Sequence, residues 1–209
     1  MFETGNNISN GCVIILMTPR MSNKIFSGLG LPHDALIAFK ESLSARQLRK
    51  GEYFITEGQS GIQLALIESG YLRTFHLDND GNEITTEFNG PGAFCSSYHS
   101  FYSQRPAYES IEAITDCHLF LISFEALQKL YAHSLPVNVM GRKALEKACM
   151  DRDYFLKRII HLPAKDKYEW FLKVYPEVYK SARLGDIASF LGIKQETLSR
   201  IRRKPSLNQ

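Results

Sequence analysis

Short apolar runs separated by turn residues dominate the chain between residues 49 and 123. The runs are EYFIT, QLALIES, YLRTFHL, EITTEF and CHLFLIS, and the turn signals between them include EGQSG, DNDGN and NGPG. The Asp80-Gly81 pair lies between two alternating runs and is typical of a β-hairpin. Strands this short and this evenly spaced predict a sandwich, barrel or jelly roll.

A period near 3.6 replaces this alternation after residue 123. SFEALQKLY predicts a short helix, and a long helix follows it. The repeating positions of the long helix are Val137, Gly141, Ala144, Ala148, Phe155, Ile159 and Leu162, interrupted by Arg152. Two interpretations stay open: the helix packs on its own β domain, or it pairs with its copy in a dimer, since small residues at 141, 144 and 148 permit close approach. Pro163 ends the helix, and AKDKYEWFLKVYPEVY predicts another.

The stretch LGDIASFLGIKQETLSRIRRK, residues 184–204, has the spacing of a helix-turn-helix. Ile187, Ala188 and Leu191 give a first short helix an apolar face, and the alanine allows a second helix to approach closely. Gly192 falls where the turn requires a positive φ. The apolar face then continues through Ile193, Leu198 and Ile201.

The second helix leaves a polar and basic set facing outward, with side chains suited to a DNA groove. The candidate DNA-binding residues are Lys194, Gln195, Glu196, Thr197, Ser199, Arg200, Arg202, Arg203 and Lys204. Arg200 can bond guanine, Gln195 adenine and Glu196 the amino group of cytosine. Arg202, Arg203 and Lys204 are better placed for phosphates. The alternative is an ordinary helical hairpin with a basic surface.

Charge supports a polyanionic partner for the C-terminal part. The whole chain carries a net charge of only +3, but residues 161–209 hold ten Lys and Arg against five Asp and Glu. The rest of the chain is slightly acidic, and such asymmetry is compatible with a polyanion such as double-stranded DNA as the partner. The alternative is an ordinary solvated face, which is what a run of charges usually forms. The longest apolar run near the start, CVIILM, is too short to span a membrane. We therefore expect a cytoplasmic protein with no membrane association.

Several other classes of protein are disfavoured by what the sequence lacks. Cysteines 12, 95, 117 and 149 show no paired spacing, so neither a disulfide frame nor a zinc site is expected, and all four are predicted to be buried. A metal enzyme of the cupin kind needs clustered ligands such as His-x-His, which does not occur. Gly-x-Ser-x-Gly and P-loop motifs do not occur either. The chain is not expected to be an enzyme.

With a β domain, a long helix and a helix-turn-helix in this order, the chain closely resembles the Crp/Fnr family of bacterial transcription regulators. The likeness covers nearly all of residues 25–204, and its motifs include Gly51-Glu52, Glu57-Gly58, Gly70 and the segment from Glu196 to Arg200. It implies an α+β fold with a leader (1–24), an N-terminal jelly-roll effector domain of the cyclic nucleotide-binding kind (25–133), a dimerisation helix (134–162) and a helix-turn-helix DNA-binding domain (163–209).

The resemblance also implies a function. A chain of this family forms a homodimer that binds a partly palindromic DNA site, with RNA polymerase as a further partner and a small molecule as effector. The alternative for this chain is a small-molecule receptor module that regulates a partner other than DNA.

The segment that would bind a cyclic nucleotide departs from the family pattern. The candidate effector-pocket residues are Phe94, Ser96, Ser97, Arg105, Ala107 and Tyr108. The carboxylate that holds the ribose falls near Ser97, and the arginine that meets the phosphate falls near Ala107 or Tyr108. A buried phosphate without its guanidinium partner is costly, so we expect weak or no cyclic AMP binding and an effector that is unknown or absent.

Cofactors and a wing are also not expected. Only Cys12 lies in the region where oxygen-sensing members hold an iron–sulfur cluster, and lone histidines such as His76, His99 and His118 are more often surface or core residues than haem ligands. Family members usually add a β-hairpin wing after the recognition helix, whereas only PSLNQ follows Lys204 here. The recognition helix is predicted to begin at Lys194, without a Ser or Thr cap.

Overall fold

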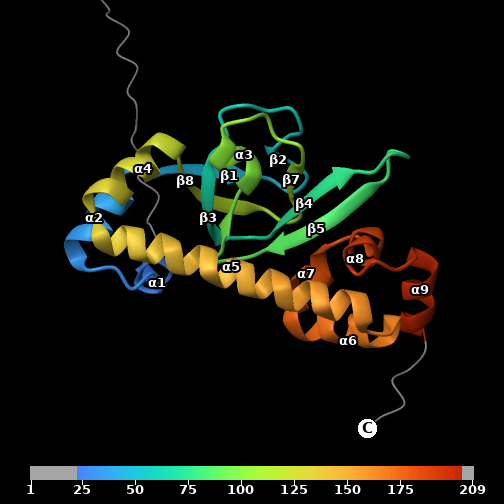
Figure 1. Cartoon of the computed structure of the whole chain (residues 1–209). Coiled ribbons are helices and arrows are strands. Elements are labelled where there is room, and N and C mark those ends of the chain that lie inside the picture. Colours follow the sequence, from blue (N-terminus) through green and yellow to red (C-terminus); the bar gives the residue numbers. More distant parts are fainter. Residues whose placement is uncertain (1–22, 204–209) are drawn as a thin grey trace, which may run out of the picture.

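The N-terminal half of the described chain is a β domain built from two antiparallel sheets. A computed structural model describes residues 23–203. Within that range the strands form two four-stranded sheets, in the orders β1-β8-β3-β6 and β2-β7-β4-β5 (Figure 1). The strands are β1 Ser44–Leu48, β2 Tyr53–Ile55, β3 Leu64–Ser69, β4 Leu72–Leu77, β5 Glu83–Asn89, β6 Phe94–Cys95, β7 Ser110–Ala113 and β8 Cys117–Ile122. The predicted jelly roll is confirmed.

The predicted runs and the predicted hairpin correspond to real elements. The five apolar runs contain β2, β3, β4, β5 and β8. The Asp80-Gly81 turn joins β4 to β5: the Asp78 carboxylate accepts the backbone N–H groups of Asp80 and Asn82, and Gly81 has a φ of +81°. The short strands β1, β6 and β7 were not predicted.

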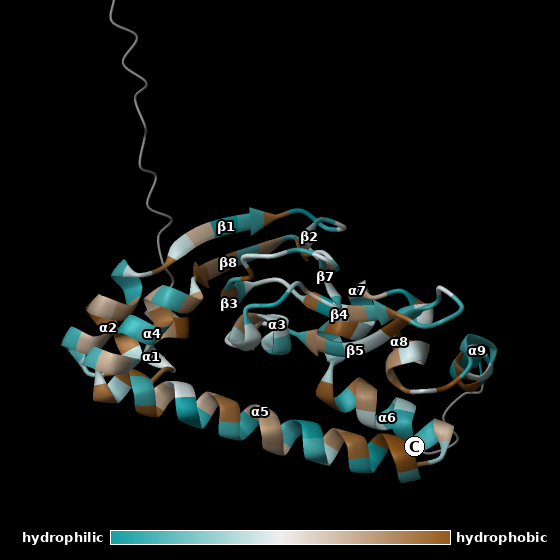
Figure 2. Cartoon of the chain, turned by 45° about the horizontal axis from the view of Figure 1, so that its top comes forward, coloured by the Kyte–Doolittle hydropathy of each residue, from teal (hydrophilic) through white to brown (hydrophobic). Residues whose placement is uncertain are grey.

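Helices surround the roll at its two ends. They are α1 Asn23–Ser27, α2 His33–Glu41, α3 Tyr98–Ser103, α4 Phe124–His133, α5 Leu135–His161, α6 Ala164–Val174, α7 Pro176–Ser181, α8 Leu184–Phe190 and α9 Gln195–Arg203. The helices α1, α2 and α4 gather at the start of α5, and α6 to α9 gather at its end (Figures 1 and 2). The predicted leader lies outside the described residues, apart from its last two, which begin α1.

The long helix α5 packs on its own chain only near its two ends. Val137 and Gly141 are buried at one end, and Phe155 and Ile159 pack into the C-terminal helices at the other. Between them, all of residues 145–154 are exposed. Two predictions are therefore corrected. Gly141 lies beneath the Tyr131 side chain, so it does not offer close approach to a second copy. Cys149 is exposed rather than buried, because it lies in the uncovered stretch.

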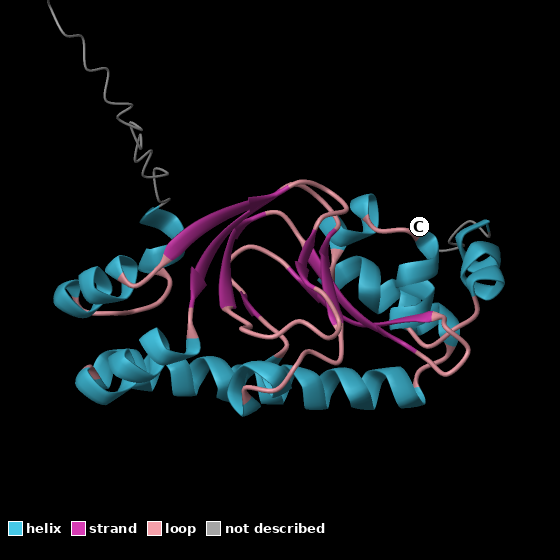
Figure 3. Cartoon of the chain, turned by 90° about the horizontal axis from the view of Figure 1, so that it is seen from above, coloured by secondary structure: helices cyan, strands magenta, loops and turns pink. Residues whose placement is uncertain are grey.

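Two apolar cores hold the molecule together. The first fills the roll and includes the fully buried Leu66, Ile67 and Phe120. The second lies among the C-terminal helices, but Phe88 of β5 and Ile114 also belong to it. The sheet β2-β7-β4-β5 therefore contributes side chains to both cores, one on each face, and the C-terminal helices lie against its outer face (Figure 3).

Candidate nucleic-acid interface

The turn between α8 and α9 is built as the sequence predicts. Gly192 has a φ of +62°, the left-handed conformation that glycine adopts without strain. Its N–H donates to the carbonyl of Ser189 at 3.0 Å, and the N–H of Ile193 donates to the carbonyl of Ala188 at 3.0 Å. These two bonds form a Schellman motif, which ends α8 and redirects the chain into α9.

Apolar side chains fix the angle between the two helices. Ile187, Ala188, Leu191 and Leu198 are buried, as the pattern predicts, and Ile193 and Ile201 pack against them. Phe190 is buried too, although it was not assigned to the predicted apolar face. Its ring lies 4.5 Å from that of Phe155 on α5. The helix pair is therefore seated both on α5 and on its own small core.

The outward side of α9 carries the candidate DNA-binding residues. Lys194, Gln195, Glu196, Arg200, Arg202 and Arg203 are exposed, Thr197 and Ser199 are half-buried, and Lys204 lies outside the described residues. Helical spacing places Glu196, Ser199, Arg200 and Arg203 on one face, opposite the buried Leu198. The helix begins at Gln195, one residue later than predicted.

Two of these residues also contact their own chain. The Gln195 carboxamide oxygen lies 2.9 Å from the position that a Cβ at Gly185 would occupy, so the absence of a side chain at 185 makes room for it. The Arg202 guanidinium lies 5.7 Å from the centre of the Tyr179 ring. Beside it, Ser199, Arg202 and Arg203 line a polar hollow of about 310 Å³. Cationic side chains around such a hollow suit a phosphate group.

The structure separates the predicted effector-pocket residues into two sets. Ser96, Ser97 and Ala107 are buried, and Phe94 is half-buried, whereas Arg105 and Tyr108 are exposed. The Ser96 hydroxyl donates to the carbonyl of Gln63 at 2.9 Å, and the Ser97 hydroxyl donates to the hydroxyl oxygen of Ser100 at 3.2 Å. Tyr108 lies outside the roll with its ring edge-on to His99. Arg105, the arginine next to the expected phosphate position, is thus at the surface.

Comparison with known proteins agrees with this arrangement of elements. Residues 45–134 match the family model of the cyclic nucleotide-binding domain. The chain is 22% identical to the transcriptional activator protein Anr of Pseudomonas protegens, over 75% of this chain and 68% of Anr. A protein from Eubacterium rectale assigned to the Crp/Fnr family of transcriptional regulators has a TM-score of 0.65 at 22% identity, with 83% of each chain covered. The chain has the Crp/Fnr fold.

A further solved structure has the same fold. The c-di-GMP responsive global regulator CLP of Xanthomonas campestris has a TM-score of 0.66 at 18% identity, covering 81% of this chain and 89% of CLP. The resemblance to the Crp/Fnr family is confirmed, with jelly roll, long helix and helix-turn-helix in the predicted order. The expectation of a missing wing concerns residues beyond Arg203, which the structure does not describe.

The interior of the roll contains acidic residues that were not singled out from the sequence. Glu109 is buried, and burial raises the pKa of its carboxyl group, although a hydrogen bond with Ser97 opposes that shift. Glu87 of β5 lies opposite Thr74 of β4, and burial raises its pKa as well. The buried Thr74 hydroxyl has no hydrogen-bond partner among residues 23–203. Glu109 directly follows the predicted pocket residue Tyr108, so its position was accessible from the sequence.

Across residues 23–203, no group of His, Cys, Asp and Glu side chains is arranged to hold a metal ion. In the same range, no helix has the length and apolar character needed to cross a membrane.

Proposed function

We propose that this chain is a DNA-binding transcription regulator that acts as a homodimer on a partly palindromic site. The observation that carries the proposal is the outward face of α9, where Arg200 and Arg203 are exposed beside Glu196 while Leu198 anchors the opposite face. A helix held this way can enter a major groove with its polar face toward the base edges. The role of Anr as a transcriptional activator makes RNA polymerase the further partner to test.

Some residues of α9 would contact bases and others would contact phosphates. Arg200 lies in the middle of the outward face, where a bidentate bond to guanine is accessible. Arg202 and Arg203 lie near the end of the helix and border the polar hollow, so they are assigned to phosphates. The Gln195 side chain lies against Gly185 of its own chain. It is therefore less available for a base contact than Glu196, the other candidate near the start of the helix.

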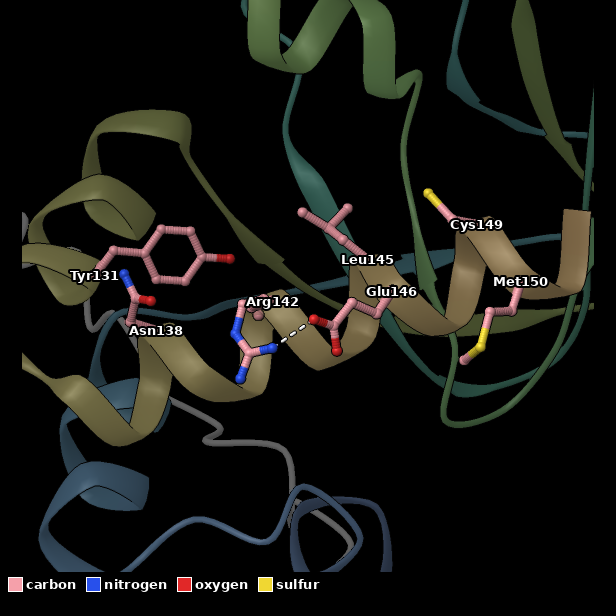
Figure 4. Close-up of a pocket in the computed structure, with 8 residues that line it drawn as sticks. Tyr131, Asn138, Arg142, Leu145, Glu146, Cys149 and Met150 are labelled. Carbon is pink, nitrogen blue, oxygen red and sulfur yellow. Dashed lines mark hydrogen bonds and ion pairs between the residues drawn. The ribbon is translucent and has the colours of Figure 1, made fainter.

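The middle of α5 supports the proposed dimer. Its exposed apolar side chains include Leu145, Met150, Leu156 and Ile160. A groove of about 650 Å³ opens beside it, lined by Tyr131, Asn138, Gly141, Arg142, Leu145, Glu146, Cys149 and Met150 (Figure 4). Leu145, Cys149 and Leu156 follow the four- and seven-residue steps of a helix-pairing seam. We therefore centre the seam on Leu145, Cys149 and Leu156 rather than on Gly141, which Tyr131 covers.

The proposed effector is not cyclic AMP. Ser97 and Ala107 provide neither a carboxylate nor a guanidinium at the positions where the family would use them. Glu109 instead places a buried carboxyl group next to Ser97. A cyclic phosphate that entered there would face another acidic group rather than a cation. Calorimetric titration with cyclic AMP and cyclic GMP should show no binding, and micromolar affinity for either nucleotide would contradict this part of the proposal.

The DNA-binding proposal is tested by selecting duplexes from a random library with the full chain and measuring their affinity for variants. Arg200→Ala should weaken specific binding by about 1–3 kcal/mol and relax the sequence preference at one position of each half-site. The matched control is Arg49→Ala, which removes the same charge from an exposed site on the β domain, away from α5 and α9. Equal loss in both variants would show that charge alone matters. Selection of no duplex by the wild type would favour the receptor-module alternative.

The dimer is tested by light scattering on the chain and on Leu156→Glu, which places a charge on the proposed seam. Leu77→Glu is the control, because Leu77 is 51% exposed at the end of β4 and Leu156 is 45% exposed on α5. We expect the wild type and Leu77→Glu to be dimers and Leu156→Glu to be a monomer. A dimeric Leu156→Glu protein would place the interface elsewhere.

A further inference from the structure

A network of five charged side chains joins the outer face of the sheet to the helix-turn-helix. The sheet supplies Arg73 of β4, Glu83 of β5 and Glu112 of β7, and the helix-turn-helix supplies Arg183 and Asp186 at the start of α8. The two helix-turn-helix residues lie about 70 to 110 positions after the three sheet residues in the sequence. The network therefore exists only when α8 is seated on the sheet.

Both arginines share the same three carboxylates. Arg73 contacts Glu83 and Glu112 at 2.7 Å each, and its Nη1 lies 3.2 Å from Oδ1 of Asp186. Arg183 lies 3.1 Å from Glu83 and 3.2 Å from Glu112, and its Nε donates to Oδ2 of Asp186 at 2.8 Å. Asp186 thus receives one guanidinium on each of its oxygens. The complete network has three carboxylates and two guanidinium groups, so each carboxylate is shared between both arginines.

Arg73 is completely buried, and each nitrogen of its guanidinium is used. Its Nε donates to Oγ1 of Thr85 at 2.9 Å, and the ring of Phe75 lies 4.3 Å from its guanidinium carbon. A buried charge is tolerated only when it is paired and hydrogen-bonded. The guanidinium is planar, so its bonds to Thr85, Glu83 and Glu112 also fix the direction in which it meets Asp186.

A second link fixes the other end of α8 to the same strand. The N–H of Thr85 donates to the Ser189 hydroxyl at 2.9 Å, and that hydroxyl donates to the carbonyl of Glu83 at 3.1 Å. Strand β5 is the last strand of its sheet in the described chain, so Ser189 bonds to an edge that other strands leave open. With contacts at both ends, α8 cannot rotate on the sheet without breaking one of them.

We propose that Arg73 is a positioning residue for DNA recognition, which holds α8 so that α9 faces the duplex in one direction. This inference rests on the proposed function. In a dimer, the two recognition helices must meet successive half-sites at a fixed spacing, about one helical turn apart. Arg73 does not touch DNA in this arrangement. Its removal would affect how well two half-sites are bound together, rather than how well one is bound.

The experiment compares the wild type with Arg73→Met, Arg73→Lys and Asp186→Asn on selected DNA. Four duplexes are used: the selected palindrome, a single half-site, and two altered palindromes with one base pair added or removed between the half-sites. In Arg73→Met and Asp186→Asn we expect half-site affinity to stay within about twofold, while preference for the natural spacing falls roughly tenfold. Arg73→Lys keeps the positive charge but loses the planar guanidinium with its fixed N–H donors, so it should retain part of the preference for the natural spacing.

The outcomes separate this inference from the proposed function. Folding of each variant is checked by circular dichroism, and Asp186→Asn is isosteric, so it serves if Arg73→Met does not fold. Unchanged spacing preference in Asp186→Asn would overturn the inference while leaving the proposed function intact. An equal loss on the half-site and the palindrome would also overturn it, because that result is expected from a structural role alone. A wild type that selects no duplex overturns the proposed function, and the positioning role with it.

Discussion

Replacement of Phe88 tests whether the C-terminal helices depend on the sheet for their core. Phe88 belongs to β5, yet its ring packs against three rings of the helix-turn-helix region. The centroid distances are 5.1 Å to Phe190, 6.0 Å to Phe171 and 6.3 Å to Tyr175. Phe88→Leu keeps most of the buried apolar surface and removes these ring contacts.

The expected magnitude follows from those contacts. Aromatic pairs contribute about 0.5–1.5 kcal/mol each beyond the area they bury, so the loss of three should lower the free energy of unfolding by roughly 2 kcal/mol. Phe88→Ala adds a cavity and should cost about 3–5 kcal/mol. The control is Phe101→Leu, because Phe101 is fully buried inside the roll and has ring contacts at 5.1 Å with Tyr102 and 5.6 Å with Phe124.

Trp170, the single tryptophan of the chain, distinguishes the two variants. It lies on α6, with ring centroids 5.7 Å from Phe155 and 5.9 Å from Tyr175. Urea unfolding followed by circular dichroism should show a similar loss of stability for Phe88→Leu and Phe101→Leu. Only Phe88→Leu should shift the Trp170 emission before unfolding. A loss below about 0.5 kcal/mol, with unchanged emission, would refute a core shared between sheet and helices.

Three further predictions follow from single positions. Gly192→Ala should cost about 1 kcal/mol of stability, as should Gly58→Ala, since both have a positive φ and neither added Cβ would clash: at 192 it would lie 3.8 Å from the Ile159 side chain, and at 58 no atom lies within 4 Å. Only Gly192→Ala should weaken DNA binding. Gly70→Ala should destabilise far more than Gly81→Ala in a thermal melt, because a Cβ at 70 would overlap the carbonyl of Asp116 and the Cys117 side chain. Burial raises the pKa of Glu109 above its ordinary value of 4.5, so the folded state binds the proton more tightly than the unfolded state does. The free energy of unfolding should therefore fall as the pH rises from about 4.5 through the raised pKa. Glu109→Gln should make stability less dependent on pH in that window, measured by urea midpoints.

The elements that local pattern specifies could be predicted from the sequence. The Asp80-Gly81 hairpin, the turn at Gly192 and the buried positions of α8 and α9 all depend on residues within a few positions of one another. The outward face of α9 follows from the same periodicity. Its role in DNA binding stays a prediction, because exposure and charge do not by themselves show what is bound.

The parts that could not be predicted depend on contacts between distant segments. Nothing in the run YLRTFHL indicates that Arg73 is buried, because a charged side chain in a strand is ordinarily exposed to solvent. In the structure four consecutive residues of β4 are buried, since the roll covers one face and α8 covers the other. Nothing local to Arg73 indicates Asp186, which lies more than a hundred residues away. The sequence left open whether Gly141 packs on its own chain or faces a second copy, because Tyr131, which covers it, belongs to another helix, α4.

The two faces of the sheet β2-β7-β4-β5 connect the interior of the roll to the helix-turn-helix at adjacent residues. On β4, Thr74 faces the interior and Arg73 faces α8; on β5, Glu87 lies opposite Thr74 and Phe88 enters the C-terminal core. On β7, Ile111 belongs to the core of the roll and Glu112 to the charge network. No element intervenes between these pairs, so a shift of β4 or β5 would change both sets of contacts at once. A ligand that bound Glu87 or Thr74 inside the roll would therefore change the contacts between α8 and the sheet through strands β4 and β5 themselves. The same ligand bound at Tyr108 would have to act through the loop that precedes β7.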